Sequence, residues 1–225
     1  IAGCGGMLGE AFYEKFKNDY DLLCTDIDQN EEWLSFQDFR EFDSYSNMVS
    51  EFKPDFIFHL GAFTDLEYCE QNPKMTYLTN TESVKYAVKI ANSQSIPLLY
   101  ISTAGIFDGN KDFYTEEDDP NPLGHYAKSK YLAEKYVVDY SNEYLICRAG
   151  WMMGGGPKKD KKFIQKILKQ IKDNKKELFI VNDKLGTPTR VSPENLSSES
   201  PTWSPDGSMV AFQGWQKGGW KIFYV

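Results

Sequence analysis

Two stretches decide the fold of this chain: Ile101-Ser-Thr-Ala-Gly-Ile-Phe-Asp-Gly109 and His125-Tyr-Ala-Lys-Ser-Lys-Tyr-Leu-Ala-Glu134, which an acidic loop separates. A short apolar run leads into the first stretch and predicts a strand that ends near Ser102. The glycines that follow interrupt this pattern and indicate a turn. The second stretch consists mostly of good helix formers. Together the two stretches predict a strand, a loop and a helix.

The predicted helix carries a candidate acid–base pair. Tyr126 and Lys130 are four residues apart and therefore face the same way. An ammonium close to a phenol favours the phenolate, so we expect Lys130 to lower the pKa of Tyr126 toward neutrality. Thr103, at the end of the preceding strand, could share the substrate oxygen. Tyrosine and lysine at this spacing also occur by chance on solvated helix faces, so the assignment depends on the rest of the chain.

The composition limits the class of protein. The chain has 225 residues and 41% hydrophobic content, enough for one full domain core and part of a second. A net charge of -8 argues against a surface for nucleic acid or anionic membrane. No apolar run approaches the roughly 20 residues of a membrane span, and no signal peptide is recognised, so we expect a cytoplasmic protein. The first residues read as the end of a strand, so we expect the natural chain to begin earlier.

The cysteine pattern argues against a disulfide framework and against a metal site. None of the four cysteines has Cys-x-x-Cys spacing, and only two histidines accompany them. Three of the four lie in or beside apolar strand-like runs. We therefore expect buried, reduced thiols. The cysteines are Cys4, Cys24, Cys69 and Cys147.

The chain opens with a glycine-rich turn, Gly3-Cys-Gly-Gly-Met-Leu-Gly9, followed by apolar residues at helical spacing. Glycines three apart permit a tight turn, close approach of backbone N–H groups to a pyrophosphate, and tight helix–strand packing. Asp26 ends a second predicted strand close to ~20 residues after the turn, where a carboxylate can bind an adenosine ribose. Since this carboxylate would repel a 2′-phosphate, NAD is favoured over NADP. A plain loop and an ordinary turn aspartate remain the alternatives.

Strand-like and helix-like segments alternate along the chain, which predicts an α/β fold with a doubly wound parallel sheet. Continuous apolar strands are expected where a sheet is buried on both faces. His59 lies in such a strand without an acid or cysteine partner nearby in the sequence, so it is read as structural. Strands are expected at 21–26, 55–60, 96–101, 144–148 and 178–181, and helices at 44–52, 73–93, 126–140 and 163–172.

Six segments carry a resemblance to a known family. They are Gly-Cys-Gly-Gly-Met-Leu-Gly at 3–9, Leu-Gly-Ala-Phe-Thr-Asp-Leu-Glu at 60–67, Ser-Thr-Ala-Gly-Ile-Phe-Asp-Gly at 102–109, Tyr-Ala-Lys-Ser-Lys at 126–130, Arg-Ala-Gly-Trp-Met at 148–152 and Leu-Gly-Thr-Pro-Thr at 185–189. In this order and spacing they resemble the extended short-chain dehydrogenase/reductase family, most closely its dTDP-4-dehydrorhamnose reductase branch. The resemblance covers residues 1–189 and implies a Rossmann-like domain that binds NAD or NADP.

The resemblance also implies site residues. The implied catalytic residues are Thr103, Tyr126 and Lys130. The implied dinucleotide contacts are Gly3, Gly6, Met7, Leu8, Gly9, Asp26, Asp38, Phe39, Leu60, Gly61 and Ala62, together with Tyr126 and Lys130. The implied substrate contacts are Asn80, Thr103, Ala104 and Trp151. The branch usually has Asp-Tyr after Ser-Thr, whereas this chain has Ala104-Gly105. The pocket wall therefore lacks a carboxylate and a phenol, so the resemblance implies the type of reaction but not the particular sugar.

After Thr189 the pattern of the family breaks. Residues 190–200 have a linker-like composition. The segments 201–212 and 220–225, with the turn Ser-Pro-Asp-Gly between strand-like runs, resemble one repeat of the TolB-type β-propellers. One blade cannot bury its own faces, so we expect region 190–225 to form a poorly anchored hairpin or one that packs on the sheet. The chain reads as a join of two unrelated pieces or as a sequence assigned with error, and we expect the sugar pocket to be incomplete.

The leading prediction is an enzyme: an NAD(P)-dependent oxidoreductase that transfers a hydride between the nicotinamide and a sugar carbon of a nucleotide sugar. Tyr126 would protonate the new alkoxide, Lys130 would hold the nicotinamide ribose, and Thr103 would orient the carbonyl. The alternatives are an epimerase or dehydratase on the same fold, a non-catalytic dinucleotide-binding regulatory subunit, and an interaction module built on the tail. A homodimer is the candidate assembly.

Overall fold

The computed structural model describes residues 1–111, 113–150, 152 and 155–159, and further on only the strands of 179–181, 188–190, 197–203, 210–216 and 219–224. The chain divides into two compact units, Ile1–Lys159 and Asp160–Val225. The domain boundary predicted between 189 and 190 falls inside the second unit. The predicted helix at 163–172 and the predicted substrate contact Trp151 lie outside the described residues.

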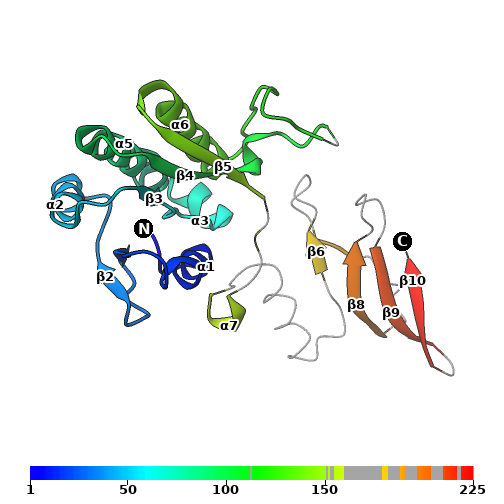
Figure 1. The fold of residues 1–225 in the computed structure, drawn as a ribbon. Coiled ribbons are helices and arrows are strands. Elements are labelled where there is room, and N and C mark those ends of the chain that lie inside the picture. The colour runs from blue at the N-terminus through cyan, green and yellow to red at the C-terminus, as the bar shows by residue number, and fades with distance from the viewer. Residues whose placement is uncertain are drawn as a thin grey trace. The chain divides into compact units, whose positions relative to one another are not determined.

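The strands of the first unit form a parallel sheet (Figure 1). β1 pairs with β2, and β3, β4 and β5 pair in that order. Ala2 joins the two groups through parallel bridges to Thr25 and His59, so the order is β2-β1-Ala2-β3-β4-β5. β2 is not among the strands predicted from the sequence. The strands are β1 (Cys24–Asp26), β2 (Leu34–Phe36), β3 (Ile57–His59), β4 (Leu98–Thr103) and β5 (Tyr144–Ala149).

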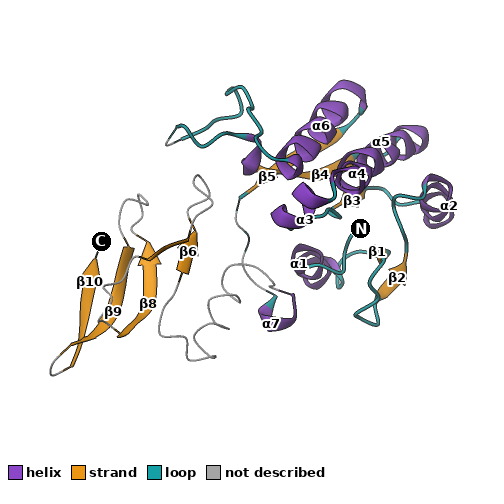
Figure 2. Ribbon diagram, turned by 180° about the vertical axis from the view of Figure 1, so that it is seen from behind, coloured by secondary structure: helices purple, strands orange, loops and turns teal. Residues whose placement is uncertain are grey.

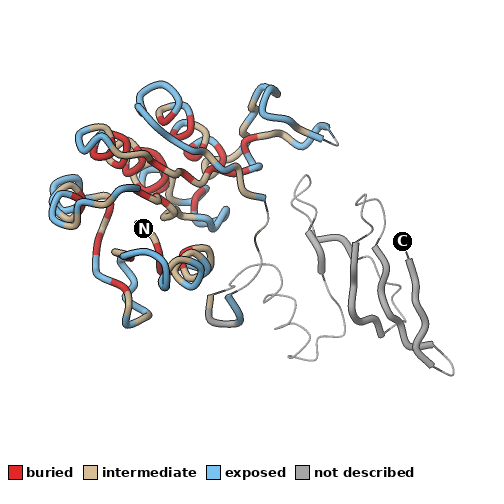
Figure 3. Tube along the Cα trace, viewed as in Figure 1, coloured by how far each residue is buried: buried red, intermediate tan, exposed pale blue. Residues whose placement is uncertain are grey.

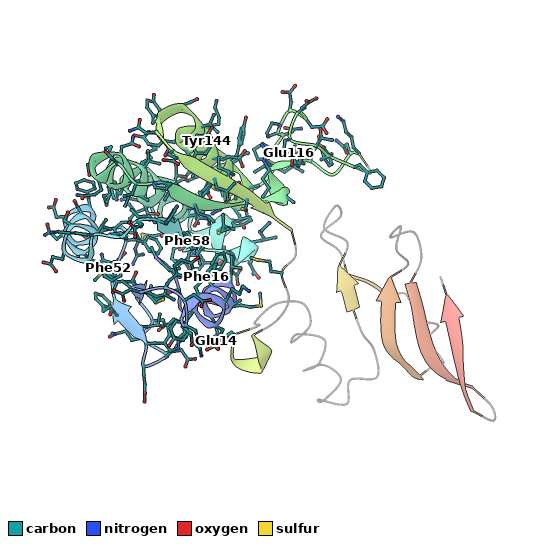
Figure 4. All side chains as sticks on the ribbon, in the orientation of Figure 1. Glu14, Phe16, Phe52, Phe58, Glu116 and Tyr144 are labelled. Atoms are coloured by element: carbon teal, nitrogen blue, oxygen red, sulfur yellow. The ribbon has the colours of Figure 1, made fainter. Side chains whose placement is uncertain are left out.

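Helices cover both faces of this sheet, as the two views show (Figures 1 and 2). Phe58 meets the rings of Phe12 and Phe16 on α1, with centroids 5.4 and 6.2 Å away (Figure 4 labels Phe16 and Phe58). The next residue, His59, points to the other face, where its Nε2 lies 3.3 Å from Ser83 Oγ on α5. The doubly wound α/β fold predicted from the sequence is confirmed. The helices are α1 (Met7–Phe16), α2 (Phe42–Phe52), α3 (Leu66–Gln71), α4 (Pro73–Tyr77), α5 (Ser83–Gln94), α6 (His125–Tyr140) and α7 (Gly156–Lys159), with one turn of 3₁₀ helix, η2 (Ala104–Ile106).

The single helix predicted at 73–93 is divided by a π-helical turn, η1 (Leu78–Glu82). Such turns are rare and frequently mark functional sites. Here Asn80, which helix propensity disfavours, occupies the turn and is fully buried. The π-helical turn thus coincides with a buried polar side chain.

The main core lies between the sheet and the helices α2, α5 and α6, where the buried segments gather in Figure 3. Val84, Ala87, Val88 and Ala91 on α5 are at most 1% exposed, as their helical spacing predicts. His59 is buried in this core as expected, and burial lowers its pKa to about 3, so it is neutral at physiological pH.

The cysteines of the described region are free thiols. Cys4, Cys24 and Cys69 are buried, as predicted, while Cys147 is exposed on β5. Within the residues that the structure describes, no cluster of three or more metal-ligating side chains occurs. The described helices include none that is long and apolar enough to cross a membrane.

The second unit contains antiparallel strands. β6 (Phe179–Val181) pairs with β7 (Pro188–Arg190), and β9 (Val210–Gln216) pairs with both β8 (Ser197–Trp203) and β10 (Gly219–Tyr224). The strand-like runs of the segments 201–212 and 220–225 overlap β9 and β10. β8 overlaps the end of region 190–200, which its composition predicts to be a linker, and adds a third strand to the pair of β9 and β10. Backbone hydrogen bonds to β9 explain why this polar segment is extended. The likeness to a propeller repeat stays a prediction.

Candidate dinucleotide and acid–base site

The glycine turn contains two glycines, Gly3 and Gly9, that the fold requires and one, Gly6, that the fold does not require. A Cβ on Gly9 would lie 2.3 Å from the carbonyl oxygen of Cys4, and Gly3 (φ +75°) would place one 2.2 Å from Gly61 Cα. Gly6 has extended backbone angles, φ -80° and ψ 177°, and a Cβ there would meet nothing within 4 Å. Gly3 and Gly9 are therefore needed for packing, whereas Gly6 leaves open space at the start of α1, where a ligand can approach.

Asp26 is positioned by the turn itself. Its carboxylate accepts a hydrogen bond from Gly5 N at 2.9 Å and another from Asp28 N at 3.0 Å. This anchors the acid at the carboxyl end of β1, the edge at which ligands bind in open α/β sheets. The geometry therefore suits the ribose-binding role predicted for Asp26.

The loop after β3 is built on the N-terminal strand and on a buried aromatic ring. Leu60 N and Gly61 N both donate to Ala2 O, at 2.9 and 3.2 Å. Phe39 is 8% exposed and packs so closely that a Cβ on Gly61 would lie 2.2 Å from its ring. The Phe39 ring therefore packs against the loop after β3. Its direct contact with the dinucleotide stays a prediction.

Four other predicted cofactor contacts lie after the strands or at the start of α1. The Arg40 guanidinium binds the Asp38 carboxylate at 2.6 Å, and this pairing holds the pKa of Asp38 below its usual range. Ala62 is half-buried in the loop after β3. Met7 and Leu8 form the first turn of α1 and are also half-buried.

The predicted acid–base residues come together at the start of α6. Thr103 ends β4, is 8% exposed, and its hydroxyl accepts a hydrogen bond from Gly105 N at 3.1 Å. The Thr103 side chain lies close enough to the Tyr126 hydroxyl to lower the pKa of that phenol. The strand end and the helix start thus place the phenol and the threonine hydroxyl where both can reach one oxygen of a substrate.

The expected lowering of the Tyr126 pKa is wrong for this structure. Burial raises the pKa of Tyr126, and the nearby Thr103 side chain offsets only part of that effect. The phenol is therefore the stable form here, which suits a group that donates a proton.

Lys130 is the most unusual group of the site. It is 3% exposed, and burial lowers its pKa to about 7, an effect that the charge of Glu134 opposes. Its Nζ lies 4.4 Å from the centroid of the Tyr100 ring. A buried lysine whose pKa is strongly lowered is frequent at functional sites, so Lys130 marks this end of α6 as a candidate binding site.

Asn80 positions the loop rather than opening into a pocket. It is 0% exposed, accepts from Phe63 N at 2.8 Å, and donates to Phe63 O at 3.0 Å and Ser129 Oγ at 3.1 Å. It therefore fastens the loop after β3 to helix α6, one residue before Lys130. The direct substrate contact predicted for Asn80 has no support in its geometry. Ala104 is exposed in η2, beside Thr103, as a pocket wall requires.

Sequence reasoning missed the groups that hold α6 in place. The carboxylate of Glu70 accepts a hydrogen bond from His125 N, and Tyr77 Oη lies 3.3 Å from His125 Nδ1. A carboxylate at a helix N-terminus accepts a hydrogen bond from a backbone N–H that lacks a partner within the helix, and it interacts favourably with the positive end of the helix dipole. No local pattern indicates Glu70, because it lies 55 residues before its partner.

A parallel sheet with a glycine turn and a Tyr–Lys helix at its carboxyl edge defines a nucleotide-binding protein of the Rossmann type. The chain belongs to the family described as the RmlD substrate binding domain, whose model matches residues 1–194. This confirms the resemblance to the dTDP-4-dehydrorhamnose reductase branch of the extended short-chain dehydrogenases/reductases.

Among curated proteins, the chain is 31% identical over 153 residues to the dTDP-4-dehydrorhamnose reductase of Escherichia coli, covering 68% of this chain and 50% of that protein. It is 26% identical over 174 residues to methionine adenosyltransferase 2 subunit beta of Danio rerio, covering 77% of this chain and 53% of that protein. The chain thus spans about half the length of these relatives.

Solved structures show the same fold. A dTDP-4-dehydrorhamnose reductase from Yersinia enterocolitica matches with a TM-score of 0.66 and 33% identity, covering 78% of this chain and 60% of that one. A reductase of the same name from Bacillus anthracis, in complex with NADP, matches with a TM-score of 0.66 and 24% identity, covering 77% of this chain and 59% of that one.

Proposed function

We propose that this chain carries the cofactor site and acid–base site of an NAD(P)-dependent reductase that acts on the keto group of a nucleotide sugar. The buried Lys130 is the single observation that carries the proposal, because the fold places an amine with three N–H donors, 3% exposed, one helical turn from Tyr126 and over the Tyr100 ring. A nicotinamide ribose beside α6 would supply hydroxyl acceptors for them. The open space over Gly6 would receive the pyrophosphate.

The residues of the chain supply binding and proton transfer. When bound, the nicotinamide provides the hydride. Tyr126 donates its phenolic proton to the oxygen that becomes an alkoxide, and Thr103 holds that oxygen by a hydrogen bond. Lys130 orients the cofactor ribose, and its ammonium stabilises the tyrosinate left after proton transfer.

The substrate class follows from the family and from the relatives named as dTDP-4-dehydrorhamnose reductases. The Ala104-Gly105 pair removes a carboxylate and a phenol that this branch usually has, so we propose a nucleotide sugar without fixing the sugar. Incubation with NADH and a panel of nucleotide 4-keto sugars tests the proposal. A reduced sugar is expected, whereas an epimerised or dehydrated product without net NADH consumption contradicts the reductase assignment.

A regulatory subunit is the second candidate function, since one relative is a subunit of methionine adenosyltransferase. Dinucleotide binding without turnover of any sugar in the panel would favour it. The complete set of Thr103, Tyr126 and Lys130 supports the enzyme instead. The homodimer and the cytoplasmic location stay predictions from the sequence.

Cofactor choice gives one prediction for Asp26. We expect tighter binding of NADH than of NADPH, because the Asp26 carboxylate repels a 2′-phosphate at the ribose. Asp26→Asn removes this repulsion and is expected to raise the affinity for NADPH relative to NADH by ~10-fold. Fluorescence titration of both cofactors measures the ratio. Asp28→Asn, an exposed neighbour, serves as the control and should leave the ratio unchanged.

The glycine turn gives a second prediction. Gly6→Val is expected to weaken NADH binding at least ~100-fold without unfolding the protein, because its Cβ meets open space that the pyrophosphate would fill. Gly9→Val is expected to lower the free energy of unfolding by several kcal/mol, because its Cβ overlaps the backbone of Cys4. Urea denaturation and NADH titration separate the two effects. Unchanged NADH affinity in the folded Gly6→Val protein would refute the location of the cofactor.

A further inference from the structure

The loop between η2 and α6 is attached to the sheet by a stack of side chains. Its described residues are 107–111 and 113–123. The Arg148 guanidinium lies over the ring of Phe107, 5.4 Å from its centroid. The ring of Tyr114 stacks on Phe107, with centroids 4.4 Å apart and 17° between the ring planes. Both contacts favour this position of the loop.

The cation in this stack is itself fixed by the fold. Arg148 lies on β5, in register with Ser102 on β4. Its Nη2 and Nε donate to the carboxylate of Glu134 on α6, at 2.7 and 3.1 Å, and Glu134 is 4% exposed. Two hydrogen bonds to one carboxylate hold the guanidinium in one orientation. Phe107 therefore packs against a group with a defined position.

Tyr114 joins the stack to a carboxylate that holds both ends of the loop. The Tyr114 hydroxyl donates to Asp108 Oδ1 at 2.6 Å. Asp108 also accepts from Asn110 N at 3.0 Å and from Asn121 Nδ2 at 3.1 Å. The loop thus has internal hydrogen bonds that fix its conformation and a stack that attaches it to the sheet, and Tyr114 takes part in both.

The loop lies on the substrate side of the proposed site. It stands out from the carboxyl end of β4, as Figures 1 and 2 show, and Figure 4 labels Glu116 on it. In the sheet, β4 and β5 lie on one side of β3, and Ala2, which the glycine turn follows, lies on the other. The pyrophosphate is proposed to bind at the glycine turn, so a loop on the far side of β3 borders the sugar rather than the adenosine.

We propose that this loop forms one wall of the substrate pocket and that Tyr114 is a positioning residue for it, through the Phe107 stack and the Asp108 carboxylate. A loop that is already held in its binding position costs less to order when the ligand arrives. Loosening the loop should therefore weaken binding of the sugar and leave the dinucleotide unaffected. The identity of the ligand, a nucleotide 4-keto sugar, rests on the proposed function.

Replacements at Tyr114 separate the two contacts. Tyr114→Leu removes both and is expected to raise the Kd of the keto sugar ~10-fold, because the loop then spends less time in its binding position. Tyr114→Phe loses only the hydrogen bond to Asp108, and a rise of ~3-fold is expected. Phe107→Leu should weaken binding nearly as much as Tyr114→Leu, and the double variant should bind no more weakly, since both break one stack. Tyr140→Leu, at the exposed end of α6, is the control and should change nothing.

The test is a calorimetric titration of the whole chain, saturated with NAD⁺, with a panel of nucleotide 4-keto sugars. Both ligands are oxidised, so binding is measured without turnover. Cleavage after the exposed Glu116 and Glu117 by a glutamate-specific protease reports the state of the loop in the free protein. Weaker sugar binding and faster cleavage in Tyr114→Leu, with unchanged NAD⁺ affinity, support the proposal.

Three results in this experiment would overturn the proposal: unchanged sugar affinity or cleavage in Tyr114→Leu, an equal loss of NAD⁺ affinity, and a wild type that binds no sugar of the panel. The supporting pattern without any NADH oxidation in the turnover assay would overturn the reductase assignment and leave this inference standing.

Discussion

Lys130→Met is expected to make the protein more stable while abolishing dinucleotide binding. Burial lowers the pKa of Lys130 from 10.5 to about 7, so keeping its ammonium inside the fold costs up to about 5 kcal/mol. Methionine has a similar length and needs no hydration. At pH 6, the free energy of unfolding of the variant should exceed that of the wild type by a few kcal/mol. Urea denaturation measures the difference.

The gain in stability from Lys130→Met should depend on pH in a defined direction. Because the folded-state pKa lies below that of the unfolded chain, the unfolded wild type binds more protons between about pH 7 and pH 10.5. Wild-type stability therefore rises with pH across this window, and the advantage of the variant should fall to about 2 kcal/mol at pH 9. Below pH 7 the advantage should be constant.

Lys128→Met is the matched control for this experiment. Lys128 lies on the same helix but is exposed, so its replacement should change stability little and without the same pH dependence. If Lys130→Met is less stable than the wild type, or if both variants change the free energy of unfolding equally, burial does not destabilise the Lys130 ammonium.

Tyr126→Phe is expected to lower turnover of the keto sugar by ~10²- to 10⁴-fold, the usual contribution of a positioned general acid. The ring stays in place at the start of α6, and only the hydroxyl beside Thr103 is lost. Steady-state kinetics should show the loss in kcat. Binding of NADH should remain within a few-fold of the wild type, because the phenol proton is needed for chemistry rather than for affinity.

Tyr131→Phe, at a half-buried tyrosine on the same helix, provides the comparison for Tyr126→Phe. It should retain near-normal turnover. Near-normal turnover in Tyr126→Phe itself would remove this residue from the reaction and with it the proposed proton transfer.

Local patterns in the sequence were sufficient for the architecture. Apolar runs such as 55–60 and 96–101 predicted the strands, because burial on both faces of a parallel sheet requires continuous apolar sequence. The spacing of Tyr126 and Lys130 placed them on one face of a helix, since neighbours four apart share a face. The short strand β2 escaped prediction, because pairing with β1, rather than its own composition, makes it extended.

The tertiary structure decided the chemistry of those residues. Burial, which depends on elements distant in sequence, raised the pKa of Tyr126 and lowered that of Lys130, against the expectation from their spacing alone. The fold also brings Asn80 within hydrogen-bond distance of the loop at Phe63, 17 residues before it, and of Ser129 on α6, 49 residues after it. The sequence by itself determined most of the strands and helices around the sheet, because those patterns are local. Only the folded structure decided which ionised groups are destabilised by burial and which are stabilised by an ion pair. Desolvation and ion pairing both depend on neighbours that lie far apart along the chain.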